Sequence, residues 1–463
     1  MPYDLSRRPL RAVLNVIIAC VLAVTTAPTP CRVFAAEPDP NSPTPNPSAT
    51  VDSEWLAAPG HPAGVEVPSV LTLETALFLT ERYNPSLRGA GWNLRRSEGI
   101  ARDAGKRPNP ELVGEAENFA WDMAPGNGEW TVALRQVFEL GGDRLARASA
   151  TGQEQRAAAH ALDGERLDAL AITSEAFLTA WSAQERHARL LLAEELARDV
   201  VRAAAERHRE GAAPEVDRLR AEVNVGLLVA ARRRAEAEMA AGRRRLAAQW
   251  GLSEAGFDSL SLPDPPDAAP AVQETLFARM PWHPSLQRAE AEGGAAEARV
   301  RAAHAARVPD LGISLGYRRL SEAEANTLVA AIALPLPIWN GGGGRVEAAE
   351  AERSAAQSVL LQSRVTLERS ARDAIDRLDA ALDAHGSMVG TVLPAARQTL
   401  VELQRGYRAG RYAILDLLAG QRSALDAEIS SLEAAQEVWS AYLALQRLAG
   451  AARPIPAKAG GTP

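Results

Sequence analysis

Two stretches of the chain repeat each other at a spacing of 199 or 200 residues. The matched landmarks keep one order in both copies: Asn84-Pro85-Ser86-Leu87 with His283-Pro284-Ser285-Leu286, Pro110 with Pro309, Gly141 with Gly341, Gly211 with Gly410, and Asp217 with Asp416. A period this long predicts a duplicated structural unit, because the repeats of solenoids are much shorter. We place the first copy at residues 71–250 and the second at 271–450, with a proline-rich linker at 251–270.

The segments outside the repeats carry different signals. Residues 1–35 have the pattern of an export signal: three arginines precede an apolar run that is too short to span a bilayer, and small residues follow it. The apolar run continues past Cys20, which leaves lipidation of that cysteine open. We expect an extended, proline-rich segment at 36–70, a flexible tail at 451–463, and no later transmembrane helix.

Charge and cysteine content exclude several classes of protein. The formal net charge is −7 although residues 1–35 contribute +3, so the rest is acidic and nucleic acid is not expected as a partner. Both cysteines, Cys20 and Cys31, lie in that first stretch, which leaves the repeats without a thiolate ligand or nucleophile. The seven histidines show no ligand spacing, and the run Gly341–Gly344 lacks the residues of a phosphate loop. We therefore predict no metal site, no cofactor and no enzymatic activity.

Each repeat is predicted to contain very long helices. Residues 72–107 and 142–209 are rich in Ala, Leu, Arg and Glu. The second of these helices would measure roughly 100 Å at 1.5 Å per residue. Apolar residues of the last helix follow the spacing of a heptad seam: Leu415, Leu418, Leu425, Ile429, Leu432, Trp439 and Leu443. The pattern predicts coiled-coil packing, while an ordinary helical bundle is the alternative that periodicity leaves open.

Two strands are predicted in each repeat, at about 110–121 and 130–140 and at about 309–318 and 327–338. Apolar and polar residues alternate along them, so each strand has one apolar face. Strands of about 9–11 residues with one apolar face are what a tilted membrane β-strand requires. A small soluble hairpin packed on the helices is the alternative.

Four strands cannot close a barrel, and open sheet edges do not occur in lipid. If the strands enter a membrane, other copies of the chain must complete the barrel, so the sequence predicts an oligomer. In such a barrel Glu115 and Glu117 would face the lumen if Leu112, Gly114 and Ala116 face lipid.

From residue 71 to residue 450 the chain resembles the TolC-like outer-membrane factor family, also called outer membrane efflux proteins. The resemblance is carried by the duplicated halves, by Asn84-Pro85-Ser86-Leu87, by Pro108-Asn109-Pro110-Glu111-Leu112 before the first strand, and by the paired turns at Gly211 and Gly410. It implies a mainly α fold with a small membrane β part. The duplicated helix–hairpin–helix halves would form a trimeric, twelve-stranded outer-membrane β-barrel that continues into a long periplasmic α-helical barrel.

The resemblance also implies a function, namely a passive outer-membrane exit duct of a tripartite efflux system. The expected partners are two further copies in a homotrimer, a periplasmic adaptor (membrane fusion protein), an inner-membrane RND transporter and outer-membrane lipid. The run Glu139-Leu140-Gly141-Gly142-Asp143-Arg144 resembles the cobalt–zinc–cadmium branch, which favours heavy-metal cations as cargo. Drug or dye efflux and type I secretion use the same architecture and stay open. A soluble periplasmic coiled-coil scaffold is a remote alternative.

In this family the two inter-helix turns form a periplasmic gate and dock the adaptor. The matching positions here are Gly211, Asp217, Tyr407, Arg408, Gly410, Arg411 and Asp416. Tyr412 stands where the TolC-type pattern has an arginine, and Ala419 where it has a further acid, so the ion pairs are not fixed. A carboxylate repeated by threefold symmetry near a narrow mouth would favour cations. The alternative is that Asp217 and Asp416 cap the starts of their helices.

Overall fold

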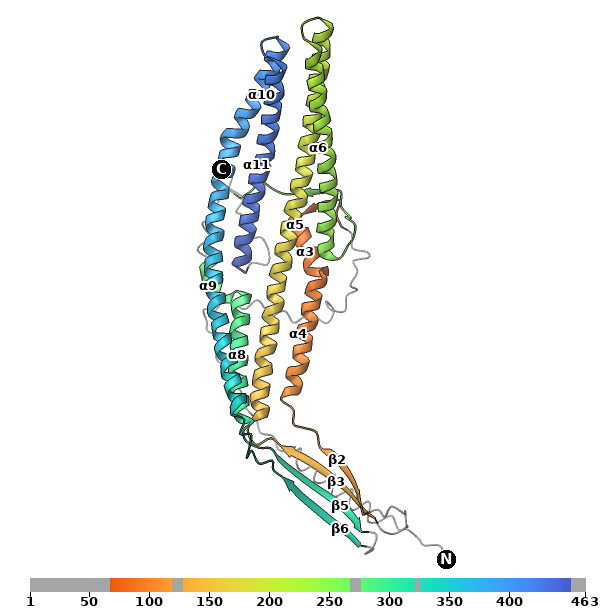
Figure 1. The fold of residues 1–463 in the computed structure, drawn as a ribbon, viewed down its shortest axis with the longest axis vertical. Helices are drawn as coiled ribbons and strands as arrows, with labels where there is room; N and C mark the ends of the chain where they lie inside the picture. The colour runs from red at the N-terminus through yellow and green to blue at the C-terminus, as the bar shows by residue number, and fades with distance from the viewer. Residues whose placement is uncertain (1–66, 119–127, 267–275, 321–324, 451–463) are drawn as a thin grey trace, which may run out of the picture. The chain divides into compact units, whose positions relative to one another are not determined.

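The computed structural model describes residues 67–118, 128–266, 276–320 and 325–450 (Figure 1). The predicted export signal, most of the proline-rich segment, part of the linker, the end of the first predicted strand and the predicted tail lie outside these residues.

In chain order the elements of the described residues are β1 (Val70–Thr72), α3 (Leu73–Tyr83), α4 (Pro85–Ala104), β2 (Glu111–Glu117), β3 (Glu129–Phe138), α5 (Asp143–Arg209), α6 (Glu215–Ala247), the 3₁₀ turn η1 (Ala248–Trp250), β4 (Ser259–Ser261), the 3₁₀ turn η2 (Met280–Trp282), α8 (Pro284–Ala305), β5 (Leu311–Leu320), β6 (Ala325–Ala333), α9 (Gly343–Ser387), the π-helical turn η3 (Met388–Val392), α10 (Leu393–Arg408) and α11 (Ile414–Leu448).

The first predicted helix, 72–107, is two helices instead of one. Asn84 has an extended backbone between α3 and α4, since a residue before proline disfavours the helical conformation. Its side-chain oxygen accepts hydrogen bonds from the amides of Ser86 at 2.9 Å and Leu87 at 3.2 Å, which caps α4. In the second repeat His283 is the residue before the proline and caps α8 through Ser285.

The long helix predicted at 142–209 is confirmed as α5, which runs without a break from Asp143 to Arg209. Its counterpart in the second repeat is interrupted: α9 ends at Ser387, and five residues of π-helix lead into α10. Gly390 lies within the π-helical turn and Pro394 follows it, and both residues weaken regular α-helical hydrogen bonding.

One antiparallel sheet joins the two repeats, with its strands in the order β2-β3-β5-β6. The central pair is β3 of the first repeat with β5 of the second, in a register that places Val132 opposite Tyr317 and Leu134 opposite Leu315. β2 and β6 are the outer strands, and neither has a strand partner on its outer edge among the described residues. Within the described part of the chain the sheet is therefore open on both sides.

The strand limits differ from those predicted. β6 ends at Ala333, whereas the sequence predicted a strand to about residue 338. Pro335 and Pro337 explain the difference, because neither has an amide hydrogen to donate to a neighbouring strand. β5 is shifted two residues later than predicted and runs from Leu311 to Leu320.

The two faces of the sheet differ in polarity. Large apolar side chains are exposed on one face: Leu112, Trp130, Val132, Ile313, Leu315, Leu328 and Ile332. On the other face Arg318 lies 3.2 Å from both Glu117 and Glu129 and donates a 2.8 Å hydrogen bond to Thr131. Glu115 lies opposite Thr131 and shares this polar face. The apolar and polar faces follow the predicted alternation.

The heptad seam predicted for the last helix is only partly correct. Leu432 and Trp439 are buried, but Leu415 is 54% exposed, and the buried face of α11 near its start is formed by Ile414 and Leu417. The seam was misplaced because small residues also pack: the side chain of Leu403 occupies the space where Gly420 would carry a Cβ. Some seam residues instead line a groove of about 390 Å³ between α5, α6 and α11, among them Leu425 and Ile429.

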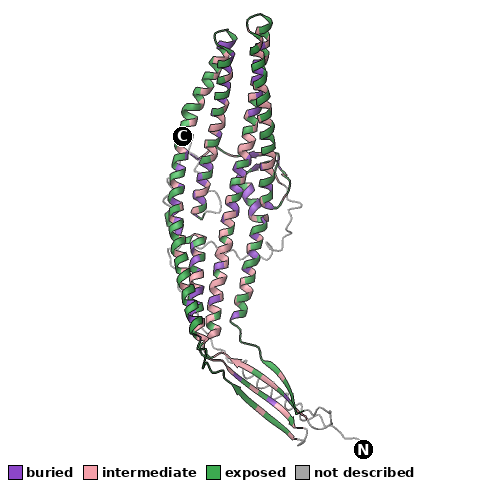
Figure 2. Ribbon diagram, viewed as in Figure 1, coloured by how far each residue is buried: buried purple, intermediate pink, exposed green. Residues whose placement is uncertain are grey.

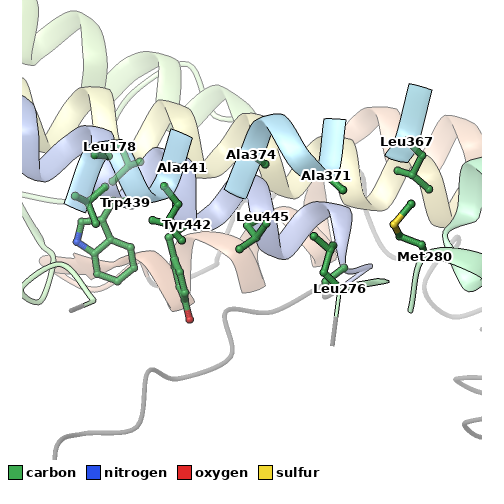
Figure 3. Close-up of a cluster of buried hydrophobic side chains, with 14 of the residues drawn as sticks. Leu178, Leu276, Met280, Leu367, Ala371, Ala374, Trp439, Ala441, Tyr442 and Leu445 are labelled. Carbon is green, nitrogen blue, oxygen red and sulfur yellow. The ribbon is translucent and has the colours of Figure 1, made fainter. Parts of the chain in front are cut away.

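Buried side chains lie along the helix contacts (Figure 2). One cluster brings α5, α9 and α11 together and includes Leu178, Leu378, Val438 and Leu445 (Figure 3). A second surrounds the fully buried Trp250 and includes Leu71, Phe177 and Leu246.

The parallel pair of β1 with β4 lies beside the second cluster, and the sequence did not predict it. Gln184 of α5 fixes β4 by two hydrogen bonds, since it accepts from the amide of Leu260 at 2.9 Å and donates to its carbonyl at 3.0 Å. In the described residues, no helix has both the length and the apolar character needed to cross a bilayer.

Candidate gate at the two helical turns

The two hairpin turns lie at the end of the helices that is away from the sheet (Figure 1). They have the same backbone construction. After α5 the amide of Ala212 donates to the carbonyl of Arg207 at 2.8 Å, and after α10 the amide of Arg411 donates to Gly406 at 2.8 Å. In each turn the glycine has a positive φ, 75° at Gly211 and 74° at Gly410. This is the Schellman ending of a helix, and its left-handed residue explains the matched glycines.

The two matched aspartates have different surroundings. Asp416 accepts a hydrogen bond from the amide of Ala413 at 3.2 Å, so it caps its own helix α11, as the alternative interpretation expected. For Asp217 the structure gives a 3.9 Å contact with Arg220, and its side chain is only 15% exposed. The same position in the two repeats therefore has a capping role in one copy and a half-hidden carboxylate in the other.

Tyr407 is the most deeply buried of the predicted gate residues, at 2% exposed. It belongs to a small apolar cluster that spans both hairpins and includes Val200 and Ala221 of the first with Ile414 and Leu417 of the second. The cluster is the apolar contact that holds the two hairpins together near their turns.

The pKa of Tyr407 is raised by burial, which the positive charge of Arg207 opposes and the negative charge of Asp217 reinforces. Both of these charged groups belong to the first hairpin. The phenol accordingly stays neutral at ordinary pH. The backbone carbonyl of Tyr407 accepts a hydrogen bond from Arg207, and the Tyr407 ring lies against the Arg207 guanidinium.

Arg207 contacts the second hairpin at this candidate site, and sequence reasoning did not single it out. Its Nη1 donates a 2.7 Å hydrogen bond to the carbonyl of Tyr407, and its guanidinium lies 4.7 Å from the centre of the Tyr407 ring. An arginine in the last turn of a helix normally serves the carbonyls of that helix. The sequence therefore offers no signal that separates Arg207 from Arg209, which pairs at 3.8 Å with Glu206 of its own helix.

The remaining predicted gate residues do not join the turns. Arg408 and Arg411 are exposed, and neither forms an ion pair with a described residue. Tyr412, which stands in place of the arginine of the TolC-type pattern, folds back over Gly406 and occupies the space where that glycine would carry a Cβ. Its ring packs against its own hairpin.

In the part of the chain that the structure describes, no group of three or more His, Cys, Asp or Glu side chains is placed to hold a metal ion. His208 at the first turn contacts Glu215 at 3.3 Å and the carbonyl of Ala213 at 3.1 Å, both within its own hairpin. What the arrangement can do is hold two helical hairpins at a fixed spacing by noncovalent contacts.

The sequence is similar, over most of its length, to that of the cobalt-zinc-cadmium resistance protein CzcC of Cupriavidus metallidurans. The two are 30% identical over 390 residues, which cover 83% of this chain and 91% of CzcC. The family model for outer membrane efflux proteins matches residues 282–451.

The chain belongs to the outer membrane efflux protein family. The nickel-cobalt-cadmium resistance protein NccC of Alcaligenes xylosoxydans xylosoxydans is 27% identical over 335 residues, covering 70% of this chain and 74% of NccC. Among solved structures, the outer membrane protein VceC of Vibrio cholerae superimposes with a TM-score of 0.67 at 20% identity, over 82% of this chain and 96% of VceC.

Family membership decides several expectations. The prediction of an outer-membrane efflux channel is confirmed, and so is the predicted fold of helices and strands. The outer membrane efflux proteins are channels of efflux systems and not enzymes, so the prediction that this protein is not an enzyme is confirmed. The protein is located in the outer membrane, with its helical part in the periplasm.

Proposed function

We propose that this protein is the outer-membrane duct of a tripartite efflux system that exports heavy-metal cations. The observation that carries the proposal is the 30% identity to CzcC over 83% of the chain, since CzcC is named for resistance to cobalt, zinc and cadmium. NccC, named for nickel, cobalt and cadmium, supports the same class of cargo. The lack of a metal cluster among the described residues is compatible with this role, because a conduit must release what it carries.

The working form that we propose is a homotrimer. The open edges of β2 and β6 support it, because a sheet in lipid needs every backbone group paired. Three four-stranded sheets joined edge to edge give a closed barrel, with Leu112, Leu328 and Ile332 toward lipid and the ion-paired face of Arg318 toward the lumen. In this arrangement the two turns form the periplasmic mouth, where a periplasmic adaptor and, through it, an inner-membrane RND transporter engage the duct.

The two turns are the proposed gate of this duct. Asp217 and Asp416 would each occur three times around the mouth, and repeated carboxylates raise the local concentration of cations. Asp416 also caps α11, so its replacement is expected to change both the mouth and the helix start. Asp217 is free of capping duties, which makes it the cleaner position for testing the charge of the mouth.

Growth of a deletion strain tests the cargo. Cells that lack the gene are expected to become sensitive to salts of cobalt, zinc and cadmium, and a plasmid copy should restore growth. Sensitivity to dyes, detergents or antibiotics without sensitivity to metals would overturn the metal assignment and favour the drug-efflux alternative. Loss of an exported protein without either phenotype would favour type I secretion.

Extraction of washed outer membranes tests the duct itself. A barrel is expected to need detergent for release, whereas a periplasmic scaffold would leave with carbonate or high salt. Release by carbonate would therefore contradict the duct whatever the growth phenotype.

A further inference from the structure

Arg207 connects the two hairpins of one chain at the level of their turns. It lies in the last turn of α5, yet its guanidinium leaves the first hairpin and contacts Tyr407 in the second. Gly410 is close enough that a Cβ added there would lie 3.7 Å from Nη2 of Arg207. Gly410 and Tyr407 of the second turn therefore both lie next to the end of this side chain.

The contact uses two properties of the guanidinium at once. One nitrogen, Nη1, donates to the backbone carbonyl of Tyr407 at 2.7 Å. The central carbon Cζ of the guanidinium lies over the Tyr407 ring, 4.7 Å from its centre. A second nitrogen reaches the carbonyl of Ala212, 3.5 Å away, in the first turn. A flat cation with several donors can satisfy a carbonyl and a ring face together, whereas an ammonium cannot do so in the same geometry.

The other cations near the turns stay within their own hairpins. Arg218 pairs with Glu215 and Glu222, and Arg220 contacts Asp217. Among the described residues of the two turns, Arg207 is the positively charged group with a contact across the gap between the hairpins.

The remaining polar contacts between the hairpins near the turns are longer and uncharged. Asn224 donates to Gln421 at 3.4 Å, and Gln421 donates to the carbonyl of Leu196 at 3.5 Å. The buried cluster around Tyr407 adds apolar contact between the hairpins, but apolar packing does not depend on the orientation of the groups in the way that a hydrogen bond does. Hydrogen bonds to charged groups are stronger than neutral ones, so loss of the Arg207 contact should weaken this junction more than loss of any of the neutral contacts.

We propose that Arg207 is the latch that holds the two turns of each protomer at the spacing of the closed mouth, acting on the carbonyl and ring face of Tyr407. The inference rests on the proposed role of the turns as the gate. Arg207 is a positioning residue, because it acts by holding Tyr407 and the second turn.

Single-channel recording in planar lipid bilayers tests the latch. Arg207→Gln is expected to raise the mean conductance of the purified trimer several-fold, and Arg207→Lys to give an intermediate value. Arg209→Gln is the matched control, since it removes the same charge two residues away and should leave conductance unchanged.

Hydrogen exchange supplies a readout that does not depend on conduction. In Arg207→Gln the amides of Gly410 and Arg411 should exchange faster, although the substitution lies in the other hairpin. A residue that only ends its own helix would change Gly211 and Ala212 alone. Size-exclusion chromatography of each variant checks that the protein is still assembled.

The outcomes separate the latch from the duct. Equal conductance in Arg207→Gln and Arg209→Gln, with unchanged exchange at the second turn, would overturn the latch and leave the duct standing. A wild-type protein that never conducts would overturn the proposed function, and the exchange experiment would still decide whether Arg207 couples the turns.

Discussion

The first helical turn after each hairpin bend has opposite chemistry in the two repeats. α6 begins with Glu215 and Arg218, which form an ion pair with side chains 44% and 31% exposed. The equivalent residues of α11 are Ile414 and Leu417, each 2% exposed in the cluster between the hairpins. The backbone of the two turns is the same, so the difference lies in what each copy packs against. The two bends therefore share one backbone conformation. The helix start after the first bend is exposed to solvent, which we call the solvated corner, and the helix start after the second bend is buried between the hairpins, which we call the apolar corner.

The long helices before the bends differ in the same sense. α5 is unbroken, while the helix of the second repeat contains the π-helical turn around Gly390. A π-helical turn holds one residue more than an α-helical turn and commonly marks a functional position. The copy that supplies the apolar corner is therefore also the copy whose long helix contains the π-helical turn. Four experiments test this contrast, from the largest expected effect to the smallest.

Single-residue deletions in the two helices should give opposite results. Leu191 and Gly390 stand at the same distance before their turn glycines, Gly211 and Gly410. Removing Leu191 rotates everything that follows it in α5 by about 100° and should abolish the assembled trimer. Removing Gly390 should convert the π-helical turn to α-helix with little loss, because the faces on either side are kept. Recovery of trimer by size-exclusion chromatography measures both, and equal loss in both deletions would erase the distinction between the helices.

The apolar corner should be sensitive to truncation. Leu417→Ala is expected to cost about 2–4 kcal/mol of local stability, since a buried leucine leaves a cavity. Leu415→Ala, two residues earlier and 54% exposed, is the matched control, with an expected change within about 0.5 kcal/mol. Hydrogen exchange at the second turn reports the difference. Similar losses for both leucines would mean that the corner is not a packed core.

The helix starts at the two proline motifs should differ in their response to pH. The Nδ1 of His283 accepts from the amide of Ser285 only when the ring nitrogen is unprotonated, whereas the Asn84 cap does not titrate. Burial lowers the pKa of His283 below its ordinary 6.5, with Arg447 adding to the effect and Asp168 opposing it. The contribution of the cap is therefore complete above pH 6.5 and is lost as the pH falls through the lowered pKa.

We expect about 1 kcal/mol of stability at the start of α8 to disappear on acidification, the usual size of an N-cap. His283→Asn should remove the pH dependence while keeping the cap. Thermal melts between pH 5 and pH 8 compare the two proteins. A melt of the wild type that does not change with pH would contradict the capping role of the neutral ring.

The solvated corner should tolerate loss of its ion pair. Replacing Glu215 and Arg218 together by glutamine is expected to leave the melting temperature unchanged, because exposed ion pairs contribute little. The hydrogen bonds from Arg218 lower the pKa of Glu215, so both groups are charged over the ordinary pH range. Destabilisation as large as that of Leu417→Ala would remove the contrast between the two corners.

The sequence predicted the parts of the fold that local patterns control. Matched glycines located both Schellman turns, and the composition of 142–209 predicted the unbroken α5. Alternation predicted the apolar and polar faces of the sheet. Two wrong predictions could have been corrected from local sequence. Pro85 divides the first predicted helix, and Pro335 ends the fourth strand early.

Other features depend on contacts between distant segments. The β1–β4 pair joins three residues near position 71 with three near 260, and neither stretch is long enough to predict alone. Arg207 could not be separated from Arg209 until the second hairpin was placed beside it. The seam of α11 was misplaced for a related reason: the side chain of Leu403, from α10, packs directly against Gly420 of α11.

The unpaired edges of β2 and β6 have a genetic consequence. In the proposed ring, each copy gives one edge and receives the other, so the contact is head to tail and a single faulty edge interrupts closure. A chain with prolines placed along β6 would still offer its intact β2 edge to a neighbouring copy, but its own β6 edge could not pair, so the barrel that includes it would not close. Expressed in equal amount beside the wild type, it would leave about one eighth of the trimers with three intact copies. Such alleles should therefore be dominant, whereas alleles that prevent synthesis should be recessive.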